Sequence, residues 1–340
     1  MPDTMRAMRI HELGGSFRLE TVPVPKPGPN DALLRLGATG VGLTLVIMRK
    51  TPGLISRYPR TMGHEIAGEV VEVGPEVRNV RPGDLVTAHF YLTCHNCNFC
   101  RSGRETLCPE FQGYVGLACD GGYAEYMTLP AVNLCKIPQG VSALDACVAE
   151  AQIKPGDLVA VVGAGGGVAI HAVQMAQVCG GHVIGVDVSE RKLETVSKLG
   201  AFAVVNPQKN DPVEEILSLT QGRGVDAYLD YVATRQTLEA GLACLARGGK
   251  LVIVGYRPPA AYGGASPSFT VDPLELLSRG QEIHGSRYCS MLELRQSLEL
   301  IRQRRIKPIV TETFKLEDTE KAFQMLEKNE ITGRAAVVFG

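Results

Sequence analysis

The sequence has no excess of charge of either sign. Its 340 residues contain 35 Lys and Arg against 36 Asp and Glu, which gives a formal net charge of −1. Nucleic acids and anionic membrane surfaces select strongly basic chains, because the phosphate groups are bound by Lys and Arg. We therefore expect neither a nucleic acid nor a membrane as a partner.

Long apolar segments are also missing. The longest apolar stretch, Leu158 to Ile170, has thirteen residues and contains four glycines. A membrane-spanning helix needs about 20 apolar residues, so this stretch is too short and too broken. Met1 to Ile10 contain no apolar run of the kind found in a secretory signal, and no repeat or low-complexity segment occurs. These absences predict a cytoplasmic protein with reduced thiols.

A dense cluster of cysteines is the strongest pattern that is present. Four of the ten cysteines follow the spacing C-x2-C-x2-C-x7-C, at Cys94, Cys97, Cys100 and Cys108. This spacing is typical of a loop folded around a tetrahedral zinc ion, and four thiolates leave no open position for chemistry. The alternatives are incidental thiols or two disulfides, but the other six cysteines show no pairing rhythm (119, 135, 147, 179, 244 and 289). We predict one structural Zn²⁺ per chain.

The pattern of predicted strands and helices changes along the chain. With 45% hydrophobic residues, the chain can bury two cores. Residues 1 to about 140 favour short strands, such as Glu65 to Val73, and prolines between 23 and 29 exclude a helix there. From Leu158 onward, strands and helices alternate, which is typical of a doubly wound parallel sheet. The predicted strands are Leu158–Val162, His182–Val186, Val225–Val232 and Lys250–Val254, and the predicted helices are Ala169–Val178 and Arg191–Leu199. Two helices, Leu292–Arg304 and Leu316–Lys328, and a strand, Ala335–Phe339, follow. The fold class is therefore α/β.

A glycine-rich turn joins the first of these strands to the first helix. It contains Gly163, Gly165, Gly166, Gly167 and Val168. Glycines let the backbone approach a pyrophosphate, and the N–H groups at the start of the helix bind it. Val168 stands where the strict G-x-G-x-x-G pattern has its last glycine. A glycine-rich turn without a ligand is thus the alternative to dinucleotide binding.

Asp187 gives the turn a functional context. It closes the next strand, twenty residues after Gly167. A carboxylate at this point accepts hydrogen bonds from the ribose hydroxyls and repels a 2′-phosphate, which predicts NAD rather than NADP. The alternative is that Asp187 caps the following helix, although Ser189 could do so instead. Arg191, in the same helix, is a further candidate for cofactor binding.

Taken together, these motifs resemble the zinc-containing alcohol dehydrogenase family, the medium-chain dehydrogenases and reductases. The resemblance covers essentially the whole chain. Its motifs are Gly63-His64-Glu65 followed by Ile-Ala-Gly-Glu-Val, the cysteine cluster, Asp120-Gly-Gly-Tyr-Ala-Glu-Tyr126, the glycine-rich turn and Thr332-Gly-Arg334.

The resemblance implies a fold and a reaction. Residues 1–149 and 287–340 would form a GroES-like, β-rich substrate domain with a structural zinc lobe at about 90–112, and residues 150–286 a Rossmann domain. Members transfer hydride between a nicotinamide and a carbon of a small carbonyl or alcohol substrate. They pair through the last Rossmann strands, here near Leu251 and Ile283, into homodimers or homotetramers.

The catalytic zinc site of the family is incomplete in this sequence. Members with that zinc carry a cysteine ligand in a Gly-Val-Cys-x-Thr-Asp stretch, where this chain reads Gly40-Val-Gly42-Leu-Thr44-Leu45. The relay histidine that follows matches Ile47. The segment that supplies the third ligand is shortened to sixteen residues between Pro138 and Pro155.

His64 remains as the one clear counterpart of a family ligand, with Glu65 beside it. A catalytic zinc needs three protein ligands, which Cys147 or Glu150 could complete only in principle. We therefore predict that no catalytic zinc binds. Without zinc, His64 is either a structural residue or a general acid that Glu65 orients.

A pocket lined by Gly42, Leu43, Leu45 and Ile47 favours substrates that carry their own activation. Enones and enoyl thioesters accept hydride at the β-carbon, while Thr44 or His64 hydrogen-bonds the developing enolate. One alternative is an alcohol dehydrogenase or ketone reductase with a rebuilt zinc site at His64. Another is a dinucleotide-binding protein without activity.

Overall fold

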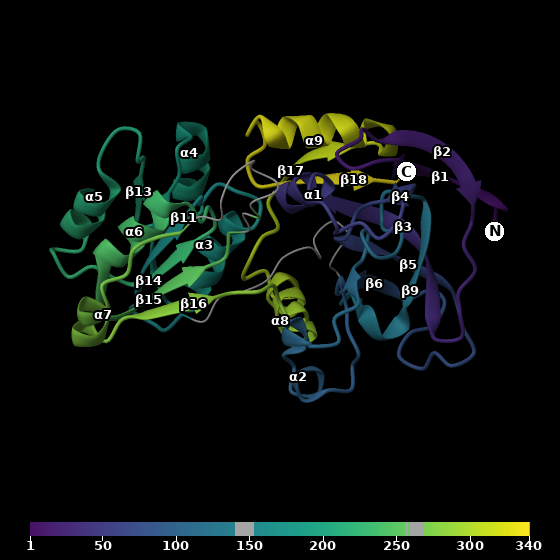
Figure 1. Ribbon diagram of the computed structural model, residues 1–340, viewed down its shortest axis with the longest axis horizontal. Coiled ribbons are helices and arrows are strands. Elements are labelled where there is room, and N and C mark those ends of the chain that lie inside the picture. Colours follow the sequence, from purple (N-terminus) through teal and green to yellow (C-terminus); the bar gives the residue numbers. More distant parts are fainter. Residues whose placement is uncertain (140–152, 256–257, 259–267, 340) are drawn as a thin grey trace. The chain divides into compact units, whose positions relative to one another are not determined.

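The chain folds into two units, one of which is formed from both ends of the sequence and the other from the segment between them. The structure is a computed structural model that describes residues 1–139, 153–255, 258 and 268–339. Unit 1 contains Met1–Val148 and Cys289–Gly340, and unit 2 contains Ala149–Tyr288. Figure 1 labels their elements. Cys147, Glu150 and nearly all of the short connection around them lie outside the described residues.

Unit 2 is built on a six-stranded parallel sheet with the order β13-β12-β11-β14-β15-β16. Its strands are β11 (Leu158–Val162), β12 (His182–Val186), β13 (Ala203–Val205), β14 (Val225–Asp230), β15 (Leu245–Ile253) and β16 (Glu282–Gly285). The chain winds outward in both directions from β11. Such a sheet has its switch point between β11 and β14, and dinucleotides bind outside the carboxyl ends of the strands there.

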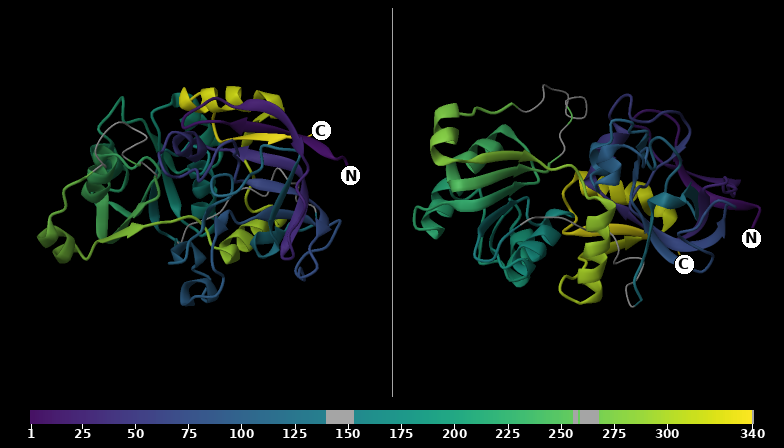
Figure 2. Two further views of the ribbon diagram at one scale, coloured as in Figure 1. Left: turned by 45° about the vertical axis from the view of Figure 1, so that its right-hand side comes forward. Right: turned by 90° about the horizontal axis from the view of Figure 1, so that it is seen from below.

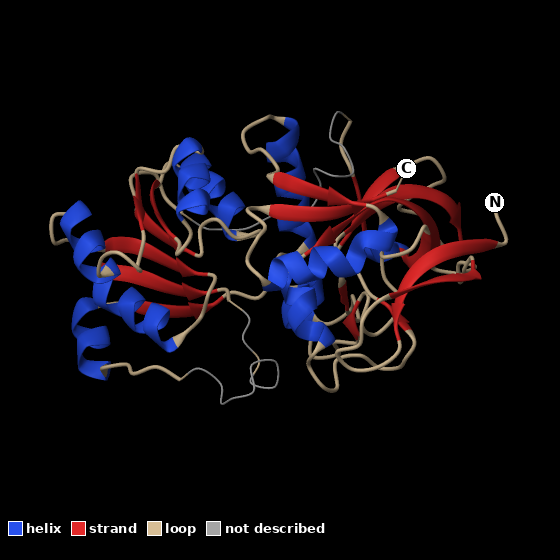
Figure 3. Cartoon of the chain, turned by 90° about the horizontal axis from the view of Figure 1, so that it is seen from above, coloured by secondary structure: helices blue, strands red, loops and turns tan. Residues whose placement is uncertain are grey.

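Helices cover both faces of this sheet (Figure 3). They are α3 (Ala169–Val178), α4 (Glu190–Lys198), α5 (Pro212–Leu219), α6 (Arg235–Cys244) and α7 (Pro273–Arg279). Side chains of a strand alternate between its two faces. Val159 and Val161 of β11 accordingly pack in one core with α3 and α4, while Ala160 and Val162 pack in another with α5 and α6.

Unit 1 is mostly β-structure drawn from both ends of the chain. One sheet has the order β10-β6-β5-β3-β18-β17 with β9 also paired to β3, a second has the order β2-β1-β4, and β7 pairs with β8. The strands are β1 (Thr4–Ile10), β2 (Arg18–Pro23), β3 (Asp31–Val41), β4 (Arg60–Thr61), β5 (Ile66–Val73), β6 (Leu85–Ala88), β7 (Tyr91–Leu92), β8 (Gly113–Tyr114), β9 (Tyr126–Pro130), β10 (Leu134–Lys136), β17 (Val310–Phe314) and β18 (Arg334–Val338). The purple β3 and the yellow β18 are antiparallel neighbours (Figure 2).

Short helices complete unit 1. They are α1 (Leu43–Arg49), α2 (Asn98–Arg101), α8 (Met291–Arg302), α9 (Thr319–Glu327) and the 3-10 turns η1 (Glu105–Leu107), η2 (Ala131–Asn133) and η4 (Leu316–Asp318). The predicted helix at 316–328 is thus a 3-10 turn followed by α9, and the predicted strand at 250–254 begins earlier, at Leu245. No described helix is long and apolar enough to cross a membrane.

Candidate functional site

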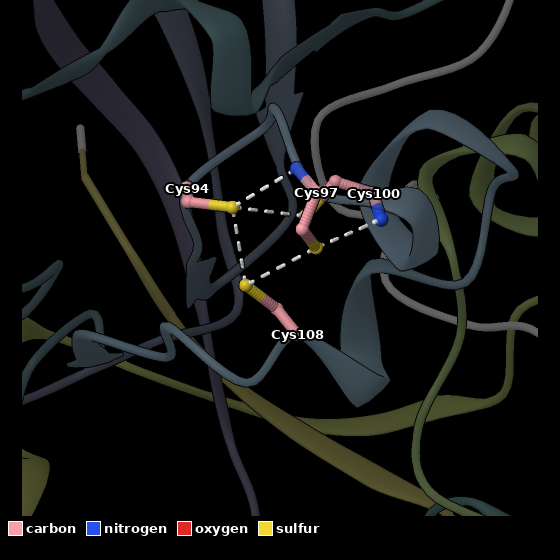
Figure 4. Close-up of side chains that lie close together, drawn as sticks. All are labelled: Cys94, Cys97, Cys100 and Cys108. Carbon is pink, nitrogen blue, oxygen red and sulfur yellow. Dashed lines mark hydrogen bonds between the residues drawn. The ribbon is translucent and has the colours of Figure 1, made fainter.

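The four clustered cysteines come together around one point in unit 1. Their sulfur atoms all lie within 4.8 Å of one another. Figure 4 shows the sulfur atoms of Cys94, Cys97 and Cys108 turned toward one another. The distances are 3.9 Å from Cys94 to Cys100, 3.9 Å from Cys97 to Cys108 and 3.5 Å from Cys108 to Cys94. Tetrahedral zinc with Zn–S bonds of about 2.3 Å separates its sulfur ligands by about 3.8 Å. The cluster therefore has the dimensions of a four-thiolate zinc site.

Backbone groups of the same loop favour thiolates in this cluster. The N–H groups of Asn96 and Cys97 donate to Cys94 Sγ at 3.5 and 3.3 Å, and these bonds lower the pKa of Cys94 to about 7. Burial instead raises the pKa of Cys100 to about 12. Four negative sulfurs this close repel one another, so full ionisation of the cluster needs a bound cation. The sulfurs are also much too far apart for disulfides, whose S–S bond is about 2.0 Å.

His64 and Glu65 lie at a second place in unit 1, just before β5. The shortest distance from His64 Nε2 to Glu65 Oε1 is 3.9 Å, which is too long for a hydrogen bond. Glu65 instead accepts a hydrogen bond of 2.8 Å from Nη1 of Arg334, at the start of β18. At this distance, Glu65 does not orient His64 by hydrogen bonding.

The ion pair between Glu65 and Arg334 lies beside Gly42, the position that the resemblance matches to the first zinc ligand of the family. A Cβ atom added at Gly42 would lie 3.3 Å from Glu65 Oε1 and 3.4 Å from Arg334 Nη1. The other carboxylate oxygen, Glu65 Oε2, is buried and has no hydrogen-bond partner among the described residues. The place of the missing cysteine is therefore next to a buried ion pair.

His64 is neutral at ordinary pH. Its ring is almost fully buried and stacks on Phe90, with ring centres 4.4 Å apart. Burial lowers the pKa of His64 to about 4, with a smaller opposing effect of Glu65. Its Nδ1 has no hydrogen-bond partner in the described part of the chain. A neutral imidazole can donate one N–H to a substrate oxygen, but it carries no charge to neutralise an oxyanion.

Thr44 lies in the first turn of α1 and is half-buried. Among the described residues, no hydrogen bond joins the Thr44 hydroxyl to His64. Within residues 1–139, 153–255, 258 and 268–339, the cysteine cluster is the one group of three or more His, Cys, Asp or Glu side chains placed to hold a metal ion.

In unit 2, the glycine-rich turn between β11 and α3 is folded tightly. Gly163 has a φ of +77°, which favours glycine, and its N–H donates to Val186 O. A Cβ atom at Gly165 would lie 2.3 Å from Cβ of Lys192, so only glycine fits there. Val168 stands at the start of α3 and is exposed. The turn is thus shaped by close contacts on one side while the other side faces solvent.

Asp187 ties this turn to the next helix. Its Oδ2 accepts the N–H of Gly165 and its Oδ1 accepts that of Ser189, both at 3.0 Å. Ser189 is the residue before α4, but its own side chain makes no capping hydrogen bond. Each carboxylate oxygen can accept a further hydrogen bond, so this anchoring is compatible with ribose binding.

Lys192 is a residue that the sequence reasoning missed. Its side chain is buried against Gly165, and burial lowers its pKa while the Asp187 carboxylate acts in the opposite direction. Arg191, which was predicted, is exposed on α4. Neighbouring residues of a helix point in different directions. The distance of Lys192 from Asp187 in the sequence therefore does not tell that its side chain faces the turn. That would require the orientation of α4.

Comparisons with known proteins agree along the whole chain. Residues 28–139 match the family model described as alcohol dehydrogenase GroES-like domain, and residues 167–303 match the one described as zinc-binding dehydrogenase. An NAD-dependent alcohol dehydrogenase of Sulfurisphaera tokodaii is 36% identical over 355 residues, with 98% of this chain and 100% of the relative covered. An acryloyl-coenzyme A reductase of the same organism is 27% identical, with 98% and 99% covered. A crystal structure of an NAD-dependent alcohol dehydrogenase superposes with a TM-score of 0.88 at 31% identity, with 99% and 100% covered.

Proposed function

Because the chain belongs to the zinc-containing alcohol dehydrogenase family and is therefore an oxidoreductase, we propose that it is an NADH-dependent reductase of conjugated carbonyl compounds that works without a catalytic zinc. The observation that carries this proposal is the place of the missing ligand. Glycine at position 42 faces the ion pair of Glu65 with Arg334, where a zinc ligand would be needed. A site without a Lewis acid suits a substrate that is already polarised.

The reaction that we propose is a conjugate reduction. When bound, NADH supplies a hydride, which adds to the β-carbon of an enone or enoyl thioester. The substrate double bond then shifts and its oxygen gains negative charge. His64 donates an N–H and Thr44 an O–H to this oxygen, and the enolate afterwards takes a proton from water at its α-carbon. Hydrogen-bond donors aimed at an oxyanion typically lower the barrier by about 3 to 4 kcal/mol each.

Two alternatives to this reaction remain. The first is an alcohol dehydrogenase with a rebuilt zinc site at His64, which the relative named NAD-dependent alcohol dehydrogenase supports. We prefer the conjugate reduction, which the relative named acryloyl-coenzyme A reductase supports, because the chain lacks the first cysteine ligand. The second alternative is a dinucleotide-binding protein without activity, which turnover of any carbonyl substrate would exclude.

Turnover of matched substrates tests the proposal. With NADH, the enone 3-octen-2-one should be reduced faster than the saturated ketone 2-octanone. Thr44→Val and His64→Ala should each lower kcat about 100-fold and change KM little, as loss of an oxyanion donor does. Thr44→Ser, which keeps the hydroxyl, is the matched control and should retain most activity. Faster turnover of the ketone, or of octan-2-ol with NAD, would support the alcohol dehydrogenase alternative.

We also propose where the cofactor and the structural zinc bind. NAD(H) would bind to the glycine-rich turn, Asp187 and Lys192, within a domain at 150–286. Asp187→Ser should narrow the preference for NADH over NADPH in titration calorimetry, because the carboxylate that repels a 2′-phosphate is lost. Tighter binding of NADPH by the unchanged protein would show that Asp187 is misassigned. One zinc would bind to Cys94, Cys97, Cys100 and Cys108.

We also propose a homodimer or homotetramer. In unit 2, β16 is an edge strand of the sheet, and α7 precedes it. Leu274 and Leu277 of α7 are 71% and 79% exposed, which is unusual for leucines so close together. Pairing of two sheets through β16 would satisfy its open backbone groups. Light scattering after gel filtration should give a molar mass that is a multiple of the 36.5 kDa of one chain. Leu277→Glu should shift this mass toward that of the monomer.

A further inference from the structure

Unit 1 contains a cavity of about 680 Å³ that none of the proposed catalytic or zinc-binding residues lines. It lies between β1, β2 and β9 and the turns before β4 and after Ala118. Its volume is within the range of small-molecule sites, about 300 to 1,000 Å³. The cavity is therefore large enough for a ligand of its own.

One wall of the cavity is apolar. Met5 of β1, Val22 of β2 and Met127 of β9 line it, together with Ala124. Met5, Ala124 and Val22 also belong to a small core cluster at the edge of unit 1. A hydrocarbon chain of several carbons would bury apolar surface against these residues, which favours its binding.

Other residues of the lining are cationic. Arg9, Arg57 and Arg60 line the cavity, and Asp120 is the one acidic residue of the lining. Arg9 is already paired with Glu20, which stands outside the lining. Arg57 is exposed and makes no hydrogen bond or ion pair with any described residue. The wall thus has a positive charge that the protein itself does not balance.

The buried Arg60 adds to the positive charge of the lining. It is 1% exposed, and its Nη1 donates to Asp120 Oδ1 at 3.1 Å while Nη2 donates to Ser56 Oγ and Ala118 O. Its Nε is buried without a partner among the residues that the structure describes. Asp120 is 49% exposed, so water weakens its attraction for the arginine. A buried guanidinium with one half-exposed counter-ion favours a second anion nearby.

We propose that this cavity binds an organic carboxylate with an apolar tail, with its carboxylate on Arg57 and above Arg60 and its tail along Met5, Val22 and Met127. A planar guanidinium binds a carboxylate through two parallel hydrogen bonds. The mixed walls favour one charged end and one apolar end over a compact, fully hydrated ion such as phosphate. This site is independent of the reaction proposed above.

Titration calorimetry with the NADH-saturated enzyme tests the site, with octanoate as the ligand and octanamide as its uncharged control. Octanoate should bind and octanamide should bind at least tenfold more weakly, because only the former has a charge for the arginines. Arg57→Gln should weaken octanoate binding about tenfold, and Arg57→Lys should recover part of it. An unchanged midpoint of thermal denaturation would show that these surface variants are folded.

Cys119 reports the place of binding, because it lines the cavity. Octanoate should slow its alkylation by N-ethylmaleimide, measured by peptide mass spectrometry, while half-buried Cys179 of unit 2 serves as the unaffected reference. Equal affinity for octanamide, unchanged binding by Arg57→Gln, or unprotected Cys119 would overturn the proposal. Protection of Cys119 by higher protein concentration alone would do so too, since a second copy of the chain would then cover the cavity.

Discussion

The cysteine cluster and the surroundings of His64 are the two places where the resemblance led us to look for zinc, and they differ in how far apart their residues lie in the sequence. The four cysteines belong to one loop of fifteen residues, and they converge at zinc dimensions. Around His64, the interacting side chains Glu65 and Arg334 are 269 positions apart. The first site is local, whereas the second depends on the packing of distant strands and has an ion pair beside Gly42.

The largest effect should come from breaking the local site. Cys97→Ser should remove the one bound zinc and lower the free energy of unfolding by about 4 kcal/mol, because loss of a structural metal is among the most destabilising changes. Elemental analysis and thermal denaturation measure the two effects. Cys179→Ser, which changes a half-buried thiol outside the cluster, should affect neither. Protein purified without chelator and free of metal would disprove the assignment.

Breaking the distant site should cost somewhat less. Glu65→Gln should destabilise the protein by about 3 kcal/mol, because it replaces the carboxylate that pairs with the buried Arg334 by a neutral amide. The matched control is Glu69→Gln, on the same strand, where the pair with Arg35 is 58% and 34% exposed. That change should cost under about 1 kcal/mol. Equal effects in urea denaturation would mean that the ion pair has no special role.

Acid should reveal whether His64 carries a metal. Its pKa is about 4 in the folded protein, below the ordinary 6.5. Below pH 6.5, His64 therefore binds a proton in the unfolded chain but stays neutral in the native state. The free energy of unfolding then falls as the pH drops toward 4, by up to about 3 kcal/mol. His64→Gln should remove this part of the pH dependence of urea denaturation. A zinc on His64 would prevent this titration and replace it with a dependence on chelator.

The smallest effect, on zinc content, should come from introducing a cysteine ligand beside His64. Gly42→Cys restores the first ligand of the family, yet its Cβ would lie 3.3 Å from Glu65 Oε1 and 3.4 Å from Arg334 Nη1. Since the described residues gather no third ligand at this place, zinc content should stay near one per chain. A rise to two, measured by elemental analysis, would show that a ligand from outside these residues completes the site.

Local sequence patterns predicted most of the fold. The alternation of valine-rich strands with helices after Leu158 indicated the doubly wound sheet, and the α/β fold class is confirmed by the matching alcohol dehydrogenase structure. The sequence predicted that a helix begins at Leu316, but residues Leu316–Asp318 form a 3-10 turn before α9. The prediction was early because hydrophobic periodicity does not distinguish such a turn from the helix that follows it. These patterns need only neighbouring residues.

Contacts between distant residues could not be predicted in the same way. The pair of Glu65 with Arg334 depends on the antiparallel register of β18 against β3, which no local pattern specifies. The position of Lys192 over Gly165 depends equally on how α4 packs on the sheet. The catalytic roles of Thr44, His64 and Glu65 remain predictions, because they depend on where a substrate lies.

The pairing of β3 with β18 also sets an order of events during protein synthesis. The ribosome makes Arg334 269 residues after Glu65, which takes about 15 to 50 s at 5–20 residues per second. All the strands of unit 2 are contiguous in sequence and emerge within that interval. The parallel sheet can therefore fold while Glu65 still has no arginine beside it. Full assembly of the sheet around His64 has to wait for the strand that is translated last.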